Sequence, residues 1–222
     1  MCSDARKNTS VRKRVINWYE QSGRRFPWRN TTDPYHILIA EILLRRTTAS
    51  AVSRVFTDFI HRFDSPNRLK RARESTIVKA LSSLGLQDLR AKQLKETASI
   101  LVKDYNGIVP RSDESLQSLL GVGDYIASAV RNFAFGEPVP LVDGNVIHFI
   151  SRVFGIHFAG PTDVQAWEFM TQFGNPHEAK LYWGIIDLVA TVCLRQNPRC
   201  GSCPLTKVCE WYTKGDIASE TA

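Results

Sequence analysis

Four cysteines lie close together near the C-terminal end of the chain: Cys193, Cys200, Cys203 and Cys209. Four thiolates can hold either a zinc ion or a 4Fe-4S cluster, and sulfur chemistry alone does not choose between them. Zinc modules usually contain two closely spaced cysteine pairs, whereas only Cys200 and Cys203 form such a pair here. Because the N-terminal residues lack the apolar segment of a secretion signal, a metal site is expected rather than disulfides.

Two acidic residues have surroundings that suit chemistry. Glu41 lies within the apolar stretch ILIAEILL, where burial would raise its pKa and allow it to deliver a proton. The alternative is that Glu41 occupies an exposed stripe of its helix. Asp143 directly precedes GNVIHFISRVFG, so on local grounds it caps the N-terminus of a helix.

A glycine hairpin with a nearby tyrosine is the third such feature. The stretch LLGVGDY places Gly121 and Gly123 in a tight turn before a predicted helix, with Tyr125 two residues further on. Backbone amides at a helix N-terminus suit a phosphate oxygen. The alternative is an ordinary turn between two helices.

The composition indicates a globular, basic protein. The chain has 222 residues, 43% of them hydrophobic, with a formal net charge of +7 and a pI near 9.3. This balance favours a polyanionic partner, usually nucleic acid, although a merely basic protein fits the charge as well. No apolar run reaches the ~18–20 residues of a membrane span. We therefore expect neither secretion nor a membrane partner.

Hydrophobic periodicity predicts helices almost throughout, and no alternating pattern is long enough to seed a sheet. Asp33 and Pro34 begin a helical pattern that runs to residue 63. Further helices are predicted at 11–21, 66–72, 75–83, 88–104, 113–119, 124–135, 144–154, 163–174 and 178–192. Glycine and prolines at 135–140 interrupt this pattern, so the fold class is all-α with a seam there.

The order and spacing of six motifs resemble one family over nearly the whole chain. They are FPWRNTTDPY (26–35), EILLRRT (41–47), GLQDLRAKQL (85–94), LLGVGDY (119–125), LVDGNV (141–146) and the cysteine loop. Together they resemble the helix-hairpin-helix DNA glycosylases of the endonuclease III and MutY branch. The resemblance implies a six-helix barrel subdomain over 27–137 and an iron-sulfur subdomain from 1–26 plus 138–222. Their active-site cleft would have Tyr125 on one wall and Asp143 on the other.

The resemblance also implies roles for the three candidate catalytic residues. Asp143 matches the family's essential aspartate, whose carboxylate stabilises positive charge on C1′ during cleavage of the N-glycosidic bond. Tyr125 stands where bifunctional members have a lysine, and a phenol cannot form a Schiff base. An enzyme without strand-cleaving activity is therefore expected, although Tyr125 could also be a half-buried helix residue. Glu41 would contact the departing base or position water.

The cysteine gaps of six, two and five residues match the family's iron-sulfur loop, so the resemblance favours a 4Fe-4S cluster with a structural or DNA-positioning role. Three basic residues of the loop, Arg195, Arg199 and Lys207, are expected to contact phosphates, the alternative being a solvated basic face.

Further DNA contacts come from the family's pattern. Leu86 holds the position of the wedge that fills the gap left by a flipped base, with plain core packing as the alternative. Arg46 and Thr47 are expected on the opposite strand side. Trp183 stands where MutY proteins carry a base-pocket glutamine.

Departures from the MutY pattern narrow the substrate. EILLRRT, Tyr125 and the short C-terminal tail look more like the thymine/uracil mismatch glycosylases, which act on T or U opposite G. Leu120 replaces a usual hairpin proline and His148 a usual arginine. An adenine glycosylase is the second hypothesis, and a non-catalytic lesion-binding module the third. The expected partner is double-stranded DNA with a mismatched or deaminated base, bound by a monomer in the nucleoid or nucleus.

Overall fold

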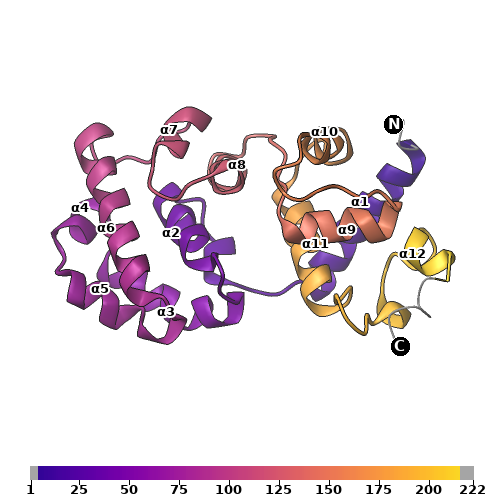
Figure 1. The fold of residues 1–222 in the computed structure, drawn as a ribbon, viewed down its shortest axis with the longest axis horizontal. Helices are drawn as coiled ribbons and strands as arrows, with labels where there is room; N and C mark the ends of the chain where they lie inside the picture. The colour runs from indigo at the N-terminus through magenta and orange to yellow at the C-terminus, as the bar shows by residue number, and fades with distance from the viewer. Residues whose placement is uncertain (1–4, 216–222) are drawn as a thin grey trace. The chain divides into compact units, whose positions relative to one another are not determined.

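The computed structural model describes residues 5–215, and within that range it contains helices and no strand. The helices, labelled in Figure 1, are α1 (Ala5–Ser22), η1 (Pro27–Arg29), α2 (Pro34–Leu44), α3 (Ala49–Arg62), α4 (Pro66–Arg71), α5 (Glu74–Ala80), η2 (Ser82–Leu84), α6 (Gln87–Asp104), α7 (Asp113–Gln117), α8 (Asp124–Phe133), α9 (Gly144–Phe154), α10 (Val164–Phe173), α11 (Ala179–Thr191), η3 (Cys200–Ser202) and α12 (Glu210–Thr213). The predicted all-α fold class is confirmed.

The chain forms two compact units. Unit 1 contains Met1–Arg24 and Pro138–Ala222, and unit 2 contains Arg25–Glu137. The hairpin, Glu41 and Tyr125 therefore belong to unit 2, whereas Asp143 and the four cysteines belong to unit 1. Among the described residues, no helix is long and apolar enough to cross a membrane.

Local signals explain where α2 begins and ends. The side chain of Asp33 accepts hydrogen bonds from the backbone N–H groups of Tyr35 (2.8 Å) and His36 (3.2 Å), and Pro34 occupies the first turn. The helical pattern from Asp33 to residue 63 is divided in two, because α2 stops at Leu44 and α3 starts after the cap residue Thr48.

The core of unit 2 surrounds α2. Tyr35 and every residue from Ile37 to Leu43 are buried, and the helix packs against α3, α6 and α8. A helix that is apolar on all sides belongs in the interior. The same burial extends to Glu41, which excludes an exposed stripe at that position.

In unit 1, α1 packs on α11, and α11 packs on α9. Gly184 lets the first pair approach closely, since a Cβ atom there would lie 2.7 Å from a methyl group of Val15. The first helix begins at Ala5, six residues before the predicted start at residue 11. Tertiary contacts explain the extra turns, because Lys7 pairs with Glu210 at 2.9 Å and lies over the ring of Phe154.

Candidate active site

In unit 1, the Asp143 carboxylate is held at the N-terminus of α9 by three donors. Its Oδ1 accepts from the backbone N–H groups of Asn145 (2.9 Å) and Val146 (2.8 Å), and its Oδ2 accepts from the side-chain amide of Asn145 (2.7 Å). The capping role predicted from local sequence is therefore present. Because the three donors fix both oxygens, the orientation of the carboxylate is set before any substrate binds.

The electrostatics of Asp143 follow from two opposing effects. Burial raises the pKa of the carboxyl group, whereas the N–H groups of Val146 and Asn145 and the charge of Arg195 lower it. Burial is the larger effect, so the pKa is raised overall. The group is thus a carboxylate of increased basicity, which suits stabilisation of a developing cation or activation of water.

Two further residues lie at or near the N-terminal half of α9: Arg195, which is predicted to contact phosphate, and His148, which stands in place of a usual arginine. Arg195 donates to the carbonyl oxygen of Gly144 at 3.1 Å, so its charge lies beside Asp143. His148 lies on α9, and its Nε2 is 3.0 Å from the carbonyl oxygen of Cys193. The histidine that replaces the family's usual arginine therefore contacts the cysteine loop.

The four cysteines surround a single small cavity in unit 1. They are free thiols, and Arg152, Trp211 and Tyr212 help to line the same cavity. Burial raises the pKa of Cys203 to about 12, and the other three cysteines contribute in the same direction. Within residues 5–215, no three His, Cys, Asp or Glu side chains are placed to hold one metal ion. The four thiols therefore share the lining of one cavity.

The other unit 1 candidates lie on the surface or at helix contacts. Trp183 is partly exposed on α11, and its ring centroid is 6.0 Å from that of Tyr19 on α1. Arg199 and Lys207 are exposed in the cysteine loop. Their exposure agrees both with phosphate contact and with a solvated basic face.

In unit 2, the hairpin turns its carbonyl groups toward the protein. Gln93 donates to Leu120 O at 2.9 Å, and Arg45 donates to Gly121 O at 3.1 Å. Gly121 has φ +74°, and a Cβ there would collide with the side-chain amide of Gln93, so any other residue would be strained at this position. Gly123 has an extended backbone, and a Cβ there would meet no atom within 4 Å. No contact within the described protein therefore requires glycine at 123.

The two remaining catalytic candidates lie on α8, which follows the hairpin, and on α2, which packs against α8. Tyr125 is partly exposed in the first turn of α8, directly after Gly123. Glu41 is 6% exposed in the last two turns of α2. Glu41 thus has the buried, apolar setting on which its predicted role in proton delivery depends.

The predicted wedge and strand-contacting residues lie on two surface loops of unit 2. Leu86 is 54% exposed, which rules out plain core packing. Its backbone has φ +52°, as does that of Arg46, which is also exposed. Left-handed backbone at residues other than glycine is costly and concentrates at functional sites. Thr47 is partly buried beside Arg46.

The structure adds residues that sequence reasoning missed. Leu89 is 65% exposed in the first turn of α6, beside Leu86. Arg90 is buried, and it contacts both surface loops. The family motif GLQDLRAKQL contains both residues, but an apolar residue and an arginine in a helix carry no signal of these roles.

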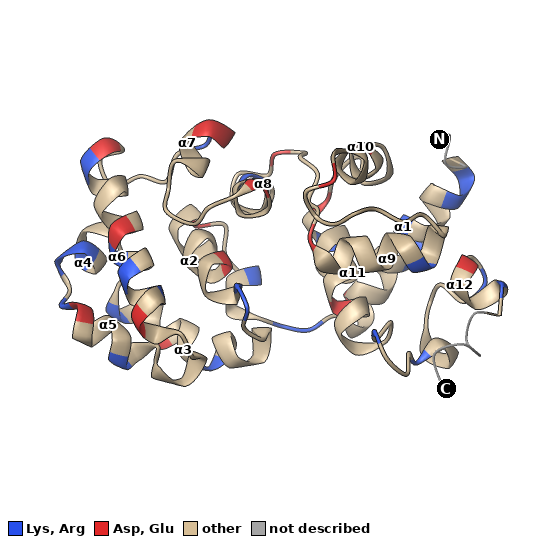
Figure 2. Cartoon of the chain, viewed as in Figure 1, with Lys and Arg blue, Asp and Glu red and all other residues tan. Residues whose placement is uncertain are grey.

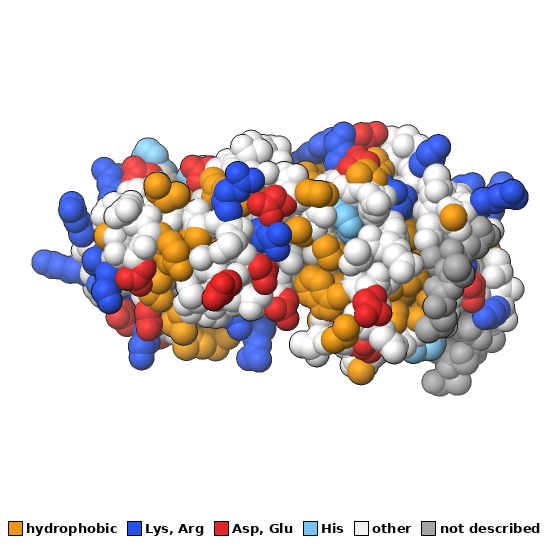
Figure 3. Space-filling model, turned by 90° about the horizontal axis from the view of Figure 1, so that it is seen from above, with side chains coloured by type: hydrophobic (Ala, Val, Ile, Leu, Met, Phe, Trp, Pro, Cys, Tyr) orange, Lys and Arg blue, Asp and Glu red, His pale blue; other side chains and the backbone are white. Residues whose placement is uncertain are grey.

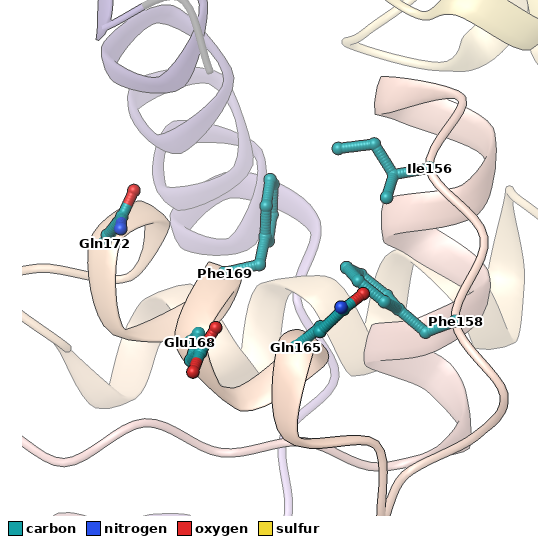
Figure 4. Close-up of a pocket in the computed structure, with 6 residues that line it drawn as sticks. All are labelled: Ile156, Phe158, Gln165, Glu168, Phe169 and Gln172. Atoms are coloured by element: carbon teal, nitrogen blue, oxygen red, sulfur yellow. The ribbon is translucent and has the colours of Figure 1, made fainter. Parts of the chain in front are cut away.

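A separate pocket in unit 1 involves none of the candidate residues. It is lined by Ile156 and Phe158 from the loop after α9, and by Gln165, Glu168, Phe169 and Gln172 from α10 (Figure 4). Its lining is aliphatic, aromatic and amide apart from the carboxylate of Glu168, and it contains no basic group.

Charge is distributed over both units rather than gathered on one helix. The most basic short helix is α4, with Arg68, Lys70 and Arg71 (Figure 2). On the face drawn in Figure 3, Lys and Arg side chains alternate with Asp and Glu and with apolar patches. The net charge of +7 therefore does not by itself locate a partner.

The comparison with known protein families decides the assignment. The model described as "HhH-GPD superfamily base excision DNA repair protein" matches residues 39–172, which include the hairpin and Asp143. This chain belongs to the HhH-GPD superfamily. The resemblance seen in the sequence motifs is thus confirmed.

Individual HhH-GPD relatives align over almost the full chain. The thymine-DNA glycosylase of Aeropyrum pernix is 40% identical over 91% of this chain and 94% of its own length. The thymine/uracil-DNA glycosylase of Pyrobaculum aerophilum is 38% identical, with 96% and 98% covered. The structure of a thermostable thymine-DNA glycosylase superposes with a TM-score of 0.87 at 34% identity, covering 94% of this chain and 98% of the other.

Adenine-specific members are less similar. The adenine DNA glycosylase of Mycobacterium tuberculosis is 35% identical over 90% of this chain, which spans only 67% of that protein.

Proposed function

We propose that this protein is a monofunctional DNA glycosylase that hydrolyses the N-glycosidic bond of thymine or uracil paired with guanine. The observation that supports the proposal most directly is sequence similarity over nearly the full chain, at 40% and 38% identity, to glycosylases named for those bases. Double-stranded DNA is then the substrate, and the protein acts on it as a monomer.

In this proposal, Asp143 provides the main chemical step. Cleavage of the bond places positive charge on C1′ and on the ring oxygen of the sugar. A fixed carboxylate stabilises that charge and can take a proton from the attacking water. The three donors on Asp143 support this role, because they hold the carboxylate in one orientation.

Tyr125 and Glu41 from unit 2 act on the same flipped nucleotide. The phenol of Tyr125 packs against the nucleotide or bonds near its sugar, and it leaves the abasic strand intact because it has no amine. Glu41 bonds the pyrimidine or positions water. The cleft between the two subdomains stays a prediction from the family resemblance.

DNA is gripped by residues of both units. The hairpin amides at Gly121 and Gly123 bind a phosphate. A Cβ at residue 123 would meet no protein atom within 4 Å, so there is room beside this residue for a DNA phosphate to approach the backbone. Leu86 fills the space of the flipped base, with Arg46 and Thr47 on the opposite strand. Trp183 borders the base pocket. Arg195, Arg199 and Lys207 add phosphate contacts.

We also propose that Cys193, Cys200, Cys203 and Cys209 hold a 4Fe-4S cluster. The cavity that the four cysteines line together, and their gaps of six, two and five residues, support this assignment. When bound, the cluster supplies a rigid cross-link for the loop that carries the three basic residues. About four iron and four sulfide per chain support the assignment, whereas one zinc contradicts it.

A panel of defined duplexes tests the function. Each duplex carries one T·G, U·G or A·8-oxoguanine pair, and the free base is measured directly. Release of thymine or uracil, with strand breaks only after alkali, supports the proposal. Release of adenine alone favours the second hypothesis. Tight binding without release of any base favours the lesion-binding module.

A further inference from the structure

We propose that Arg90 is a positioning residue that fixes the two surface loops expected to open the duplex. One loop is residues 45–47, and the other is the Gly85–Leu86 turn. The inference rests on the proposed function, since that function assigns the wedge and the strand contacts to these loops.

The contacts of Arg90 join segments about forty residues apart in sequence. Its guanidinium donates to the carbonyl oxygens of Gly85 (3.1 Å), Ile42 (3.4 Å), Leu43 (2.8 Å) and Arg45 (2.6 Å), and to the hydroxyl of Thr47. Five donors in a planar fork are needed to reach so many acceptors, and lysine cannot reproduce this arrangement.

The charge of Arg90 is used in an unusual way. The residue is 5% exposed, and no ion pair between Arg90 and a carboxylate occurs in the described part of the chain. Three of its partners are instead carbonyl groups at the C-terminal end of α2, those of Ile42, Leu43 and Arg45, where the helix dipole favours a cation. Burial and the neighbouring Arg45 lower the pKa of Arg90. A buried cation is a costly way to fill space, so a specific geometric role is its better explanation.

The loops that Arg90 joins have backbones that need support. Arg46 and Leu86 both have φ +52°, a conformation that residues other than glycine adopt only under constraint. Each follows a residue whose carbonyl group Arg90 binds, namely Arg45 and Gly85. The guanidinium is thus bonded next to both strained positions.

The same network reaches the hairpin. Arg45, whose carbonyl group is bound by Arg90, uses its side chain to bind Gly121 O. Gln93, one turn further along α6, binds Leu120 O. Arg90, Arg45 and Gln93 therefore form one hydrogen-bonded frame that connects the wedge, the strand-contacting loop and the phosphate-binding hairpin. A frame of this kind sets the distance between the wedge and the gripped phosphate.

This role predicts a defect that depends on the cost of opening the duplex. Uracil is offered either in a U·G pair or inside a bubble of unpaired bases, where no opening is required. Arg90→Lys is expected to slow single-turnover release from the U·G duplex on the order of tenfold to a hundredfold. Release from the bubble should change less than about threefold, because the wedge is not needed there.

A matched control is Leu101→Val, which changes a fully buried residue of the same helix away from the loops. It lowers thermal stability without touching the frame, so both substrates should be affected alike. Equal slowing of duplex and bubble by Arg90→Lys, or no slowing at all, overturns the inference. Failure of the wild type to release any base overturns the proposed function instead.

Thr47→Val provides a second variant if Arg90→Lys does not fold, since it removes one acceptor and leaves the arginine in place. A smaller loss of release that is again confined to the duplex, with unchanged affinity for duplex DNA, supports the frame, because loss of a direct strand contact by Thr47 would lower that affinity as well. Equal rates for wild type and Thr47→Val on both substrates contradict it.

Discussion

Asp143 caps the N-terminus of α9, and the proposed function also gives it the main chemical step; one substitution separates the two roles. Asparagine caps helices as well as aspartate does, so Asp143→Asn keeps the start of α9. The substitution removes the carboxylate, and base release should fall at least about a hundredfold. Single-turnover kinetics with a U·G duplex measure this loss, and unchanged release means that another group performs the chemistry.

The raised pKa of Asp143 gives the same substitution a second expected result. A carboxyl whose pKa is raised on folding binds its proton more tightly in the native state, so its ionisation opposes folding at neutral pH. Asp143→Asn should therefore be more stable than wild type at pH 7 by urea denaturation. The gain should vanish as the pH falls below ~3.9, where unfolded wild type is also protonated. A variant less stable at pH 7 contradicts this account.

In the proposed function, the identity of residue 125 determines whether the strand is cut. Tyr125→Lys places an amine in the first turn of α8, where it can attack C1′ and form a Schiff base. Borohydride should then trap a covalent adduct with U·G DNA. Tyr125→Phe is the control and should form none. If the lysine variant yields no adduct either, the residue does not face the sugar.

At the scale of the element, the two hairpin glycines have different reasons to be glycine. Gly121→Ala forces a side chain onto a positive φ and against Gln93, so it should destabilise unit 2 by about 1–2 kcal/mol. Gly123→Ala meets open space, so stability should fall by less than about 1 kcal/mol. Affinity for duplex DNA should nonetheless drop, because the new methyl group would occupy the space that the proposed phosphate contact requires. Unchanged affinity for Gly123→Ala means that the hairpin does not touch DNA.

The helices were predictable because their ends carry local chemistry. Asp33, Asp143 and Asp163 accept backbone N–H groups as caps, and helices start there as expected. The first turns of α1 were not predicted, because their residues are mostly polar. They are stabilised by the ion pair between Lys7 and Glu210, which is far away in sequence. The family motifs indicated the candidate residues of the site, and the roles of these residues remain proposals. Arg90 could not be found, because its partners are distant in sequence.

At the scale of the whole molecule, binding should follow counterion release. Each neutralised phosphate contributes roughly −0.9 to the slope of log K against log salt. Lys207→Ala should make that slope shallower by about 0.9, because one phosphate contact is lost. Lys180→Ala is the matched control, since Lys180 already pairs with Glu20 at 2.6 Å. Equal slopes for Lys207→Ala and wild type would leave the cysteine loop outside the DNA contact.

The central claim is base removal by hydrolysis without strand cleavage. The most direct test incubates the wild type, with its metal content measured, with a U·G duplex and follows free uracil and strand length in one sample. We predict stoichiometric uracil release, with the strand intact until alkali is added. Strand cleavage that accompanies release, or no release from either U·G or T·G, would contradict the account.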